Sequence, residues 1–182
     1  MNRAMLPALL LLPFALAACA TAPADRPAAT AESTLTAART AKLTAPDGRA
    51  VDVVVMAPAK PRGVILFSHG GGSNPGATAE LTERLVDQEF AVLSPVHTDS
   101  QSLPADRRTD LRGALATRVA DMKVTAEYAA QTFPGLPAGE VGFSYGALTA
   151  LIGGGALSNM IPGAIGSVKA VVMSLPPVRS AS

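Results

Sequence analysis

The sequence predicts an α/β protein in which a mostly parallel β-sheet is flanked by helices. The first observation is a continuous apolar run, Val64-Ile65-Leu66-Phe67, which is typical of a strand buried on both faces of a parallel sheet. The second is a stretch between residues 110 and 131 in which apolar residues recur every three or four positions, as on one face of a helix. The members of this face are Leu111, Leu115, Val119, Met122, Ala126 and Ala129. A chain of 182 residues, of which 48% are hydrophobic, is enough for one domain with its own core.

The predicted elements begin with a hairpin and continue as strands that alternate with helices. They are strands at residues 39–44 and 51–56 joined by the turn Pro46-Asp47-Gly48, a strand at 64–67, a helix at 77–88, a strand at 90–93, a helix at 110–131, a strand at 139–144, a helix at 147–152 and a strand at 168–173. Such an alternation implies right-handed crossovers and an open sheet.

The strand predicted at residues 139–144 is the least typical of the set. Val141 and Phe143 are its only large apolar residues, and Glu140 lies beside them. A central strand covered on both faces is expected to be more hydrophobic.

The N-terminus has the features of an export signal. Residues 1–18 combine a positive charge at Arg3 with an apolar stretch, Leu6 to Leu16, that is too short to span a bilayer. The sequence Leu16-Ala17-Ala18-Cys19 resembles the lipobox of bacterial lipoproteins, in which the cysteine is acylated and becomes the first mature residue. The alternative is an ordinary secretory signal that is cleaved near the same position.

Residues 19–34 are small, contain proline and lack large apolar side chains, so we expect a flexible tether there. The folded domain is expected over residues 35–182. Under the lipoprotein interpretation, Cys19 anchors the protein to a membrane in the bacterial cell envelope. Ala20, rather than Asp, follows the cysteine, which by resemblance to Gram-negative lipoproteins favours the periplasmic face of the outer membrane.

The residues Gly142-Phe143-Ser144-Tyr145-Gly146 form a Gly-x-Ser-x-Gly motif between a predicted strand and a predicted helix. A serine on such a tight turn needs small neighbours, which the two glycines provide, and this arrangement is the nucleophile elbow of serine hydrolases. Ser144 is therefore the candidate nucleophile. The alternative is a serine in an ordinary turn.

The order of these motifs resembles the N-terminal two-thirds of an α/β-hydrolase, close to exported dienelactone-hydrolase-like and platelet-activating-factor-acetylhydrolase-like esterases. The resemblance rests on the strand 64–67 leading into Ser68-His69-Gly70-Gly71-Gly72-Ser73, on the elbow, and on Val168-Lys169-Ala170-Val171-Val172-Met173. It implies an incomplete α/β-hydrolase-type sheet, in which the C-terminal strands and helices are missing.

The resemblance also implies how the site would work. Ser144 would form an acyl-enzyme with a small-molecule or lipid ester. The oxyanion would be bound by the backbone N–H of Tyr145 and by that of Gly71 or Gly72. The use of serine favours ordinary carboxylic esters over dienelactones.

The histidine and acid of a catalytic triad are the unmet requirement. In this family they follow the nucleophile, but no His, Asp or Glu follows Ser144 in the sequence. The two histidines, His69 and His97, both precede it. By resemblance His69 shapes the glycine loop, and it is also a candidate pocket-lining residue. His97 follows a predicted strand, so it either lines a pocket, replaces the missing base together with Asp99, or lies in a solvated loop.

Other classes of function have less support. A net charge of +1 without a basic stretch gives no reason to expect nucleic acid. No metal-ligand spacing is present, and no cofactor is implied. Residues 70–76 are an alternative phosphate-binding loop, but Pro75 breaks the glycine pattern and no Gly-Lys-Ser/Thr follows.

Two explanations account for a nucleophile elbow without its base. In the first, the chain is a truncated form of an active exported esterase and shows little turnover by itself. In the second, it is a non-catalytic envelope lipoprotein that keeps the scaffold for binding. The first explanation is preferred, and the weak strand at residues 139–144 gives the second some support.

Overall fold

The computed structural model describes residues 35–155 and 169–173. Their elements are the strands β1 (Leu35–Thr44), β2 (Ala50–Pro58), β3 (Gly63–Ser68), β4 (Phe90–Pro95), β5 (Ala138–Phe143) and β6 (Lys169–Met173), the helices α1 (Ala79–Asp87), α2 (Leu111–Thr132) and α3 (Tyr145–Gly153), and the short 3₁₀ helices η1 (Pro75–Thr78) and η2 (Ala105–Arg107). The signal peptide and tether predicted over residues 1–34 lie outside the described residues, and so does Cys19.

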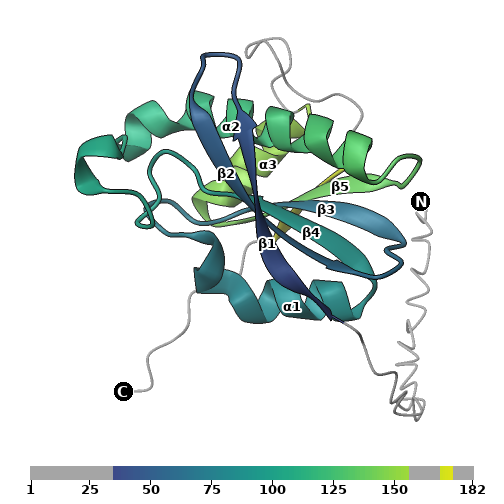
Figure 1. The fold of residues 1–182 in the computed structure, drawn as a ribbon. Helices are drawn as coiled ribbons and strands as arrows, with labels where there is room; N and C mark the ends of the chain where they lie inside the picture. Colours follow the sequence, from purple (N-terminus) through teal and green to yellow (C-terminus); the bar gives the residue numbers. More distant parts are fainter. Residues whose placement is uncertain (1–34, 156–168, 174–182) are drawn as a thin grey trace, which may run out of the picture. The chain divides into compact units, whose positions relative to one another are not determined.

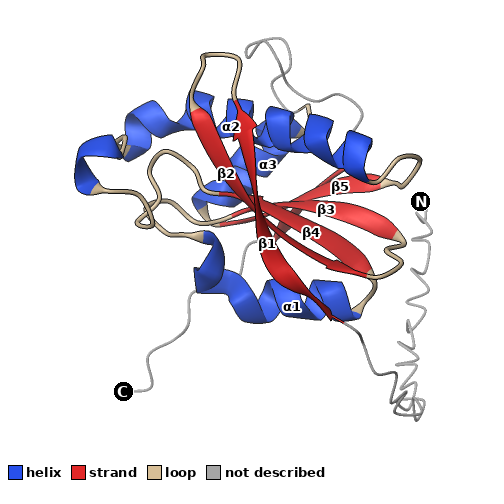
Figure 2. Cartoon of the chain, in the orientation of Figure 1, coloured by secondary structure: helices blue, strands red, loops and turns tan. Residues whose placement is uncertain are grey.

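The described strands form one mixed sheet in the order β1-β2-β4-β3-β5-β6. β1 pairs antiparallel with β2, and β2 pairs antiparallel with β4. The remaining pairs, β4 with β3, β3 with β5 and β5 with β6, are parallel. A mostly parallel sheet flanked by helices is therefore confirmed, and the hairpin forms its antiparallel side (Figure 2).

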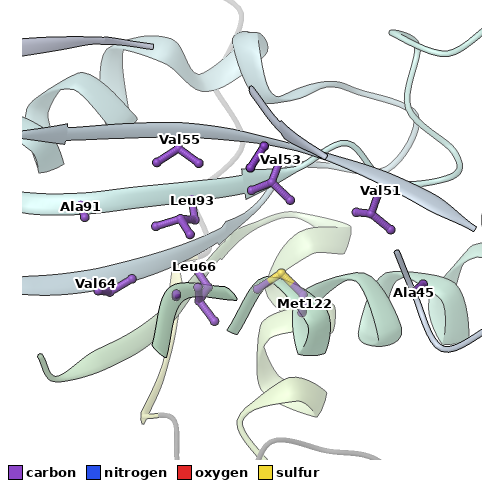
Figure 3. Close-up of a cluster of buried hydrophobic side chains, with 11 residues drawn as sticks. Ala45, Val51, Val53, Val55, Val64, Leu66, Ala91, Leu93 and Met122 are labelled. Atoms are coloured by element: carbon purple, nitrogen blue, oxygen red, sulfur yellow. The ribbon is translucent and has the colours of Figure 1, made fainter. Parts of the chain in front are cut away.

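Helices cover both faces of the sheet, with α1 on one side and α2 and α3 on the other (Figure 1). Successive residues of β3 point to opposite faces. Leu66 packs into the cluster on the α2 side, whereas Phe67 packs into the cluster on the α1 side. Figure 3 shows the first cluster, in which valines of β2, Leu93 of β4 and Leu66 of β3 lie on one side of Met122 of α2. Burial of β3 on both faces explains why its sequence is continuously apolar.

Helix α2 begins where the sequence predicts, because the side chain of Asp110 accepts a hydrogen bond from the Gly113 N–H at 2.7 Å and caps the first turn. Its buried face differs from the predicted one. Leu111 is 49% exposed, whereas Arg118 and Asp121 are completely buried. The apolar spacing therefore placed the helix correctly and described its inner face only in part.

Strand β5 is central in the described sheet although its sequence is weakly apolar, since it pairs with β3 on one side and β6 on the other. Glu140 is fully buried within it. In the described part of the chain, no helix is long and apolar enough to cross a bilayer.

Candidate active site

Ser144 lies at the junction of β5 and α3, at the carboxyl end of a parallel strand. Its backbone has φ 53° and ψ −119°, a combination that residues other than glycine rarely adopt. Its side chain is exposed. A strained, exposed serine between a strand and a helix has the geometry of a nucleophile elbow.

Gly142 and Gly146 permit this tight turn. A Cβ atom on Gly142 would collide with the backbone oxygen of Gly146, and a Cβ on Gly146 would collide with the carbonyl oxygen of Ser68. Both contacts are with backbone, which cannot move aside as a flexible side chain can. Gly142 is thus required by the tightness of the elbow itself, and Gly146 by the packing of the elbow against the end of β3.

The glycine loop after β3 lies beside the elbow. A Cβ on Gly71 would lie 3.2 Å from the Cβ of Tyr145 and 2.8 Å from Cδ2 of Leu111. The Tyr145 hydroxyl donates a hydrogen bond to the Leu111 carbonyl oxygen at 2.7 Å, which joins the start of α3 to the start of α2. Gly71 and Tyr145, two of the residues predicted as oxyanion donors, are therefore neighbours in space.

The third predicted donor, Gly72, is already occupied. Its N–H donates to Oδ2 of Asp99 at 2.8 Å, so it is not free for an oxyanion. The N–H of Gly71 makes no hydrogen bond to another described residue. Gly71 is accordingly the better of the two alternatives for the loop donor. Tyr145 is the first residue of α3, where the backbone N–H has no partner within the helix.

A buried ion pair between Arg118 and Asp99 contacts the glycine loop that follows β3. The Arg118 guanidinium donates from Nε to Oδ1 of Asp99 and from Nη2 to Oδ2, both at 2.8 Å. Burial acts to raise the pKa of Asp99, but hydrogen bonds from Arg118 and from the Gly72 N–H outweigh it and hold that pKa below its ordinary value. Asp99 is therefore a carboxylate in the fold, and its charge balances that of Arg118.

His97 belongs to a second buried group. Its Nε2 lies 2.9 Å from Oγ of Ser68, and its Nδ1 lies 3.0 Å from Oδ2 of Asp121. The carboxylate can only accept, so Nδ1 carries the proton and Nε2 accepts from the serine hydroxyl. This is the hydrogen-bond order of a Ser-His-Asp triad, but all three side chains are fully buried and no substrate can reach them.

These contacts correct three expectations for His97. It neither lines a pocket nor lies in a solvated loop, because its side chain is completely buried. It pairs with Asp121 rather than with Asp99, and both of its ring nitrogens are engaged. Burial lowers the pKa of His97, against the opposing hydrogen bond to Asp121, so the ring is neutral. Among residues 98–108, which follow His97 in the sequence, residues 101–108 are exposed apart from Leu103, and residues 98–100 are not.

His69 is also buried and does not line a pocket. Its Nδ1 lies 2.8 Å from the Gly70 carbonyl oxygen, and its Nε2 accepts the His97 N–H at 3.3 Å. Nδ1 therefore carries the proton and the ring is neutral. Burial, together with the neighbouring His97, lowers the pKa of His69 to about 3. The side chain therefore binds the backbone of the glycine loop.

Solved structures with a similar fold include esterases and a lipase. A cold-adapted esterase from an Arctic intertidal metagenomic library, in a PEG-bound complex, matches with a TM-score of 0.58 at 20% identity, over 74% of this chain and 59% of its own. A lipase in an open form matches with a TM-score of 0.60 at 20% identity, over 75% of this chain and 44% of its own. A highly thermostable carboxyl esterase from Bacillus coagulans, in complex with glycerol, matches with a TM-score of 0.59 at 18% identity, over 76% of this chain and 44% of its own.

The chain has the α/β-hydrolase fold. It spans about half the length of the solved structures that it matches. No protein-family model and no curated protein matches the sequence. The fold class predicted from the sequence is confirmed at this level.

The sequence pattern did not indicate several residues that shape this candidate site. The sequence pattern predicts a helix for Arg118 and Asp121 and a loop for Ser68, and it assigns no functional role to these three residues. A signal was present, because two charged residues occur three positions apart among apolar residues that face the sheet. Charged residues are almost never fully buried unless they are paired, so their spacing indicated a buried polar group.

Glu140 is a further buried acid of the α/β-hydrolase sheet. Both carboxyl oxygens lack a hydrogen-bond partner among the described residues. Gly153 of α3 leaves room for them, because a Cβ there would lie 2.9 Å from Cδ of Glu140. Burial raises the pKa of Glu140 to about 8, so the carboxyl is mostly protonated at neutral pH.

A pocket of about 480 Å³ is lined by residues of the β1–β2 hairpin and of the segment that begins at the end of β4. Two of its basic side chains are paired, Lys42 with Asp52 at 2.9 Å and Arg49 with Asp47 at 2.7 Å, and Arg107 also lines it. Nη2 of Arg49 also lies 3.0 Å from Oδ1 of Asp121. Neither atom makes a hydrogen bond, so this contact is an ion pair only. Within residues 35–155 and 169–173, no cluster of three or more metal-ligating side chains is found.

Proposed function

We propose that this protein is a serine hydrolase that cleaves carboxylic esters through an acyl-enzyme on Ser144. The observation that carries the proposal is the exposed Ser144 at φ 53°, with its side chain at the start of α3 and Gly71 beside its neighbour Tyr145. The esterase and lipase neighbours of the fold support the same reaction class.

The residues would divide the work in the following way. Oγ of Ser144 attacks the ester carbonyl carbon and releases its proton to solvent. When the tetrahedral intermediate collapses, the C–O bond to the leaving group breaks, and the alkoxide takes up a proton from solvent and departs as the alcohol. The negative oxygen of that intermediate accepts hydrogen bonds from the N–H groups of Tyr145 and Gly71. One such donor is worth about 3 to 4 kcal/mol in a serine protease. Water then hydrolyses the acyl group and regenerates the serine.

Neither histidine of the sequence is available as the base. The two nitrogens of His97 are bound to Ser68 and Asp121, and those of His69 are bound to the loop backbone and to the His97 N–H. We therefore expect slow turnover by the 182-residue chain. A serine protease whose catalytic triad has been removed by mutation still accelerates the reaction about 10³- to 10⁴-fold over water, through oxyanion stabilisation and substrate binding alone.

The substrate is a small-molecule or lipid ester. Leu111, which is half exposed and lies next to Gly71, would offer an apolar contact to the group beside the ester carbonyl. A closer relation to dienelactone-hydrolase-like or platelet-activating-factor-acetylhydrolase-like esterases is part of the same proposal. It rests on the order of the sequence motifs.

For location we propose the cell envelope, with a lipid anchor on Cys19 and a tether over residues 19–34. The support is the lipobox-like sequence that ends at Cys19. Labelling of the expressed protein with radioactive palmitate tests this location: incorporation into the wild type and its loss in Cys19→Ala are expected. Equal incorporation in both proteins would contradict a lipid anchor.

A fluorophosphonate probe tests the proposed reaction, because it forms a covalent bond to an activated serine. Wild-type protein is expected to label and Ser144→Ala is not, while Ser102→Ala, which removes an exposed serine from the loop after β4, is the matched control. Added imidazole can supply the missing base, so the labelling rate of the wild type should rise with imidazole concentration. Folded wild-type protein that fails to label even with imidazole would instead favour the non-catalytic scaffold.

A further inference from the structure

The Arg118–Asp99 ion pair is placed where it can control one peptide group of the candidate site. Arg118 is completely buried, although arginine is almost never buried unless it is paired. Two of its donors bind Asp99 side-on. This bidentate geometry fixes the plane of the guanidinium, so the directions of its remaining N–H groups are also fixed.

Those remaining donors bind the glycine loop. Nη1 donates to the His69 carbonyl oxygen at 2.9 Å, and Nη2 donates to the Gly70 carbonyl oxygen at 3.0 Å. The Gly70 carbonyl and the Gly71 N–H belong to one planar, trans peptide group and point in opposite directions. Holding the Gly70 oxygen therefore sets the direction of the Gly71 N–H.

Asp99 holds the next peptide group in the same way. Its Oδ2 accepts the Gly72 N–H at 2.8 Å, which fixes the plane that also contains the Gly71 carbonyl. Both peptide planes that flank Gly71 are thus bound to one ion pair. Glycine needs such external support, because it has more backbone freedom than any other residue.

The ion pair also contacts the elbow. The Arg118 guanidinium carbon lies 5.0 Å from the centroid of the Tyr145 ring, within the range of a cation–π contact. One side chain therefore lies against both the loop that carries Gly71 and the residue that carries the other expected donor.

We propose that Arg118 and Asp99 are positioning residues that aim the Gly71 N–H at the oxyanion formed on the Ser144 acyl group. The inference rests on the proposed function. It adds that the oxyanion site is held by a buried ion pair from α2 and the segment after β4, and not by the loop alone.

The test compares Arg118→Lys with wild type. Lysine keeps the positive charge beside Asp99, but it cannot bind Asp99 side-on and two carbonyl oxygens at once. The expected result is a fall of about 10-fold or more in the maximal rate of fluorophosphonate labelling, because a misdirected oxyanion donor costs up to about 10²- to 10³-fold. The probe concentration that gives half the maximal rate should change less than about twofold, since the donor acts mainly in the transition state.

Arg112→Lys, an exposed arginine on the same helix, is the matched control and should label at the wild-type rate. Rates are compared at a temperature at which circular dichroism shows each variant to be folded. A role in stability alone would lower the melting temperature of Arg118→Lys and leave its labelling rate in the folded state unchanged, and that result would overturn the proposal.

Amide exchange in protein labelled with ¹⁵N-glycine provides a readout independent of the reaction. The Gly72 amide should exchange faster in Arg118→Lys than in wild type or Arg112→Lys, because the Asp99 carboxylate is no longer held in place. Failure of the wild type to label would overturn the proposed function, and Gly72 exchange would still decide whether the ion pair holds the loop. An unchanged exchange rate of the Gly72 amide in Arg118→Lys would overturn the proposal that the ion pair holds the loop.

Discussion

Replacing Glu140 by glutamine should make the protein more stable above pH 5, by an amount that grows with pH. The carboxyl of Glu140 is buried under α3 and has no hydrogen-bond partner among the described residues. Glutamine has nearly the same shape and cannot ionise, so it removes the charge without opening a cavity.

The magnitude follows from the difference between the folded and unfolded states. The pKa of Glu140 rises from 4.5 to about 8 on burial. Between these values the unfolded chain has released the proton and the folded chain still holds it, so the free energy of unfolding falls as pH rises through this range and levels off above it. At about 1.4 kcal/mol per pKa unit, the loss is about 3 kcal/mol at pH 7 and about 5 kcal/mol above pH 8.

Urea denaturation of wild type and Glu140→Gln, followed by circular dichroism at pH 5, 6, 7, 8 and 9, measures this difference. The two proteins should differ little at pH 5, and their free energies of unfolding should then diverge by about 1.4 kcal/mol per pH unit up to pH 8. Glu83→Gln, which removes an exposed glutamate from α1, is the matched control. A constant difference between Glu140→Gln and wild type from pH 5 to pH 9 would refute the reasoning, because it would mean that the carboxyl is already ionised in the fold.

Two further predictions concern the loop and the elbow. Gly146→Ala places a Cβ against the carbonyl oxygens of Ser68 and His69, so it should lower the free energy of unfolding in urea by about 3 kcal/mol or more and abolish labelling of Ser144. The control, Ala147→Gly in the same helix, should still label. A Gly146→Ala protein that is fully stable and labels would contradict the packing described. His69 has a pKa lowered from 6.5 to about 3, so the unfolded chain binds its proton first as pH falls, and this residue should cost about 2 kcal/mol of stability at pH 5. That part of the acid-side slope should be absent in His69→Gln, and equal slopes for the two proteins between pH 7 and pH 5 would show that the ring is protonated in the fold.

The fold could be predicted largely because its signals are local. Strand β3 is continuously apolar because helices cover both faces, and α2 shows its period over 22 residues. The elbow could also be predicted, since its two glycines are required by contacts within a short segment and with the adjacent end of β3.

The support of the site could not be predicted in the same way. Arg118 binds Asp99, His69 and Gly70, which lie 19, 49 and 48 positions away in the sequence. Periodicity describes which side of a helix is inside, but it does not say which distant residue a buried charge will meet. Glu140 illustrates the same limit, because the composition of its strand is weakly apolar and the strand is nevertheless paired on both sides.

The length of these connections has a consequence for how the protein acquires its site during folding. His97 joins Ser68 and Asp121 across 29 and 24 positions, and the Arg118 contacts with the loop are longer still. Closing such long loops is entropically costly, so contacts of this kind form late, after local helices and hairpins. A folding intermediate in which the helices and the β1–β2 hairpin have formed would therefore still lack a fixed conformation in the glycine loop. The capacity to stabilise an oxyanion would appear only in the last stage of folding, and it would be the first property lost when the ends of β3 and β4 separate from α2.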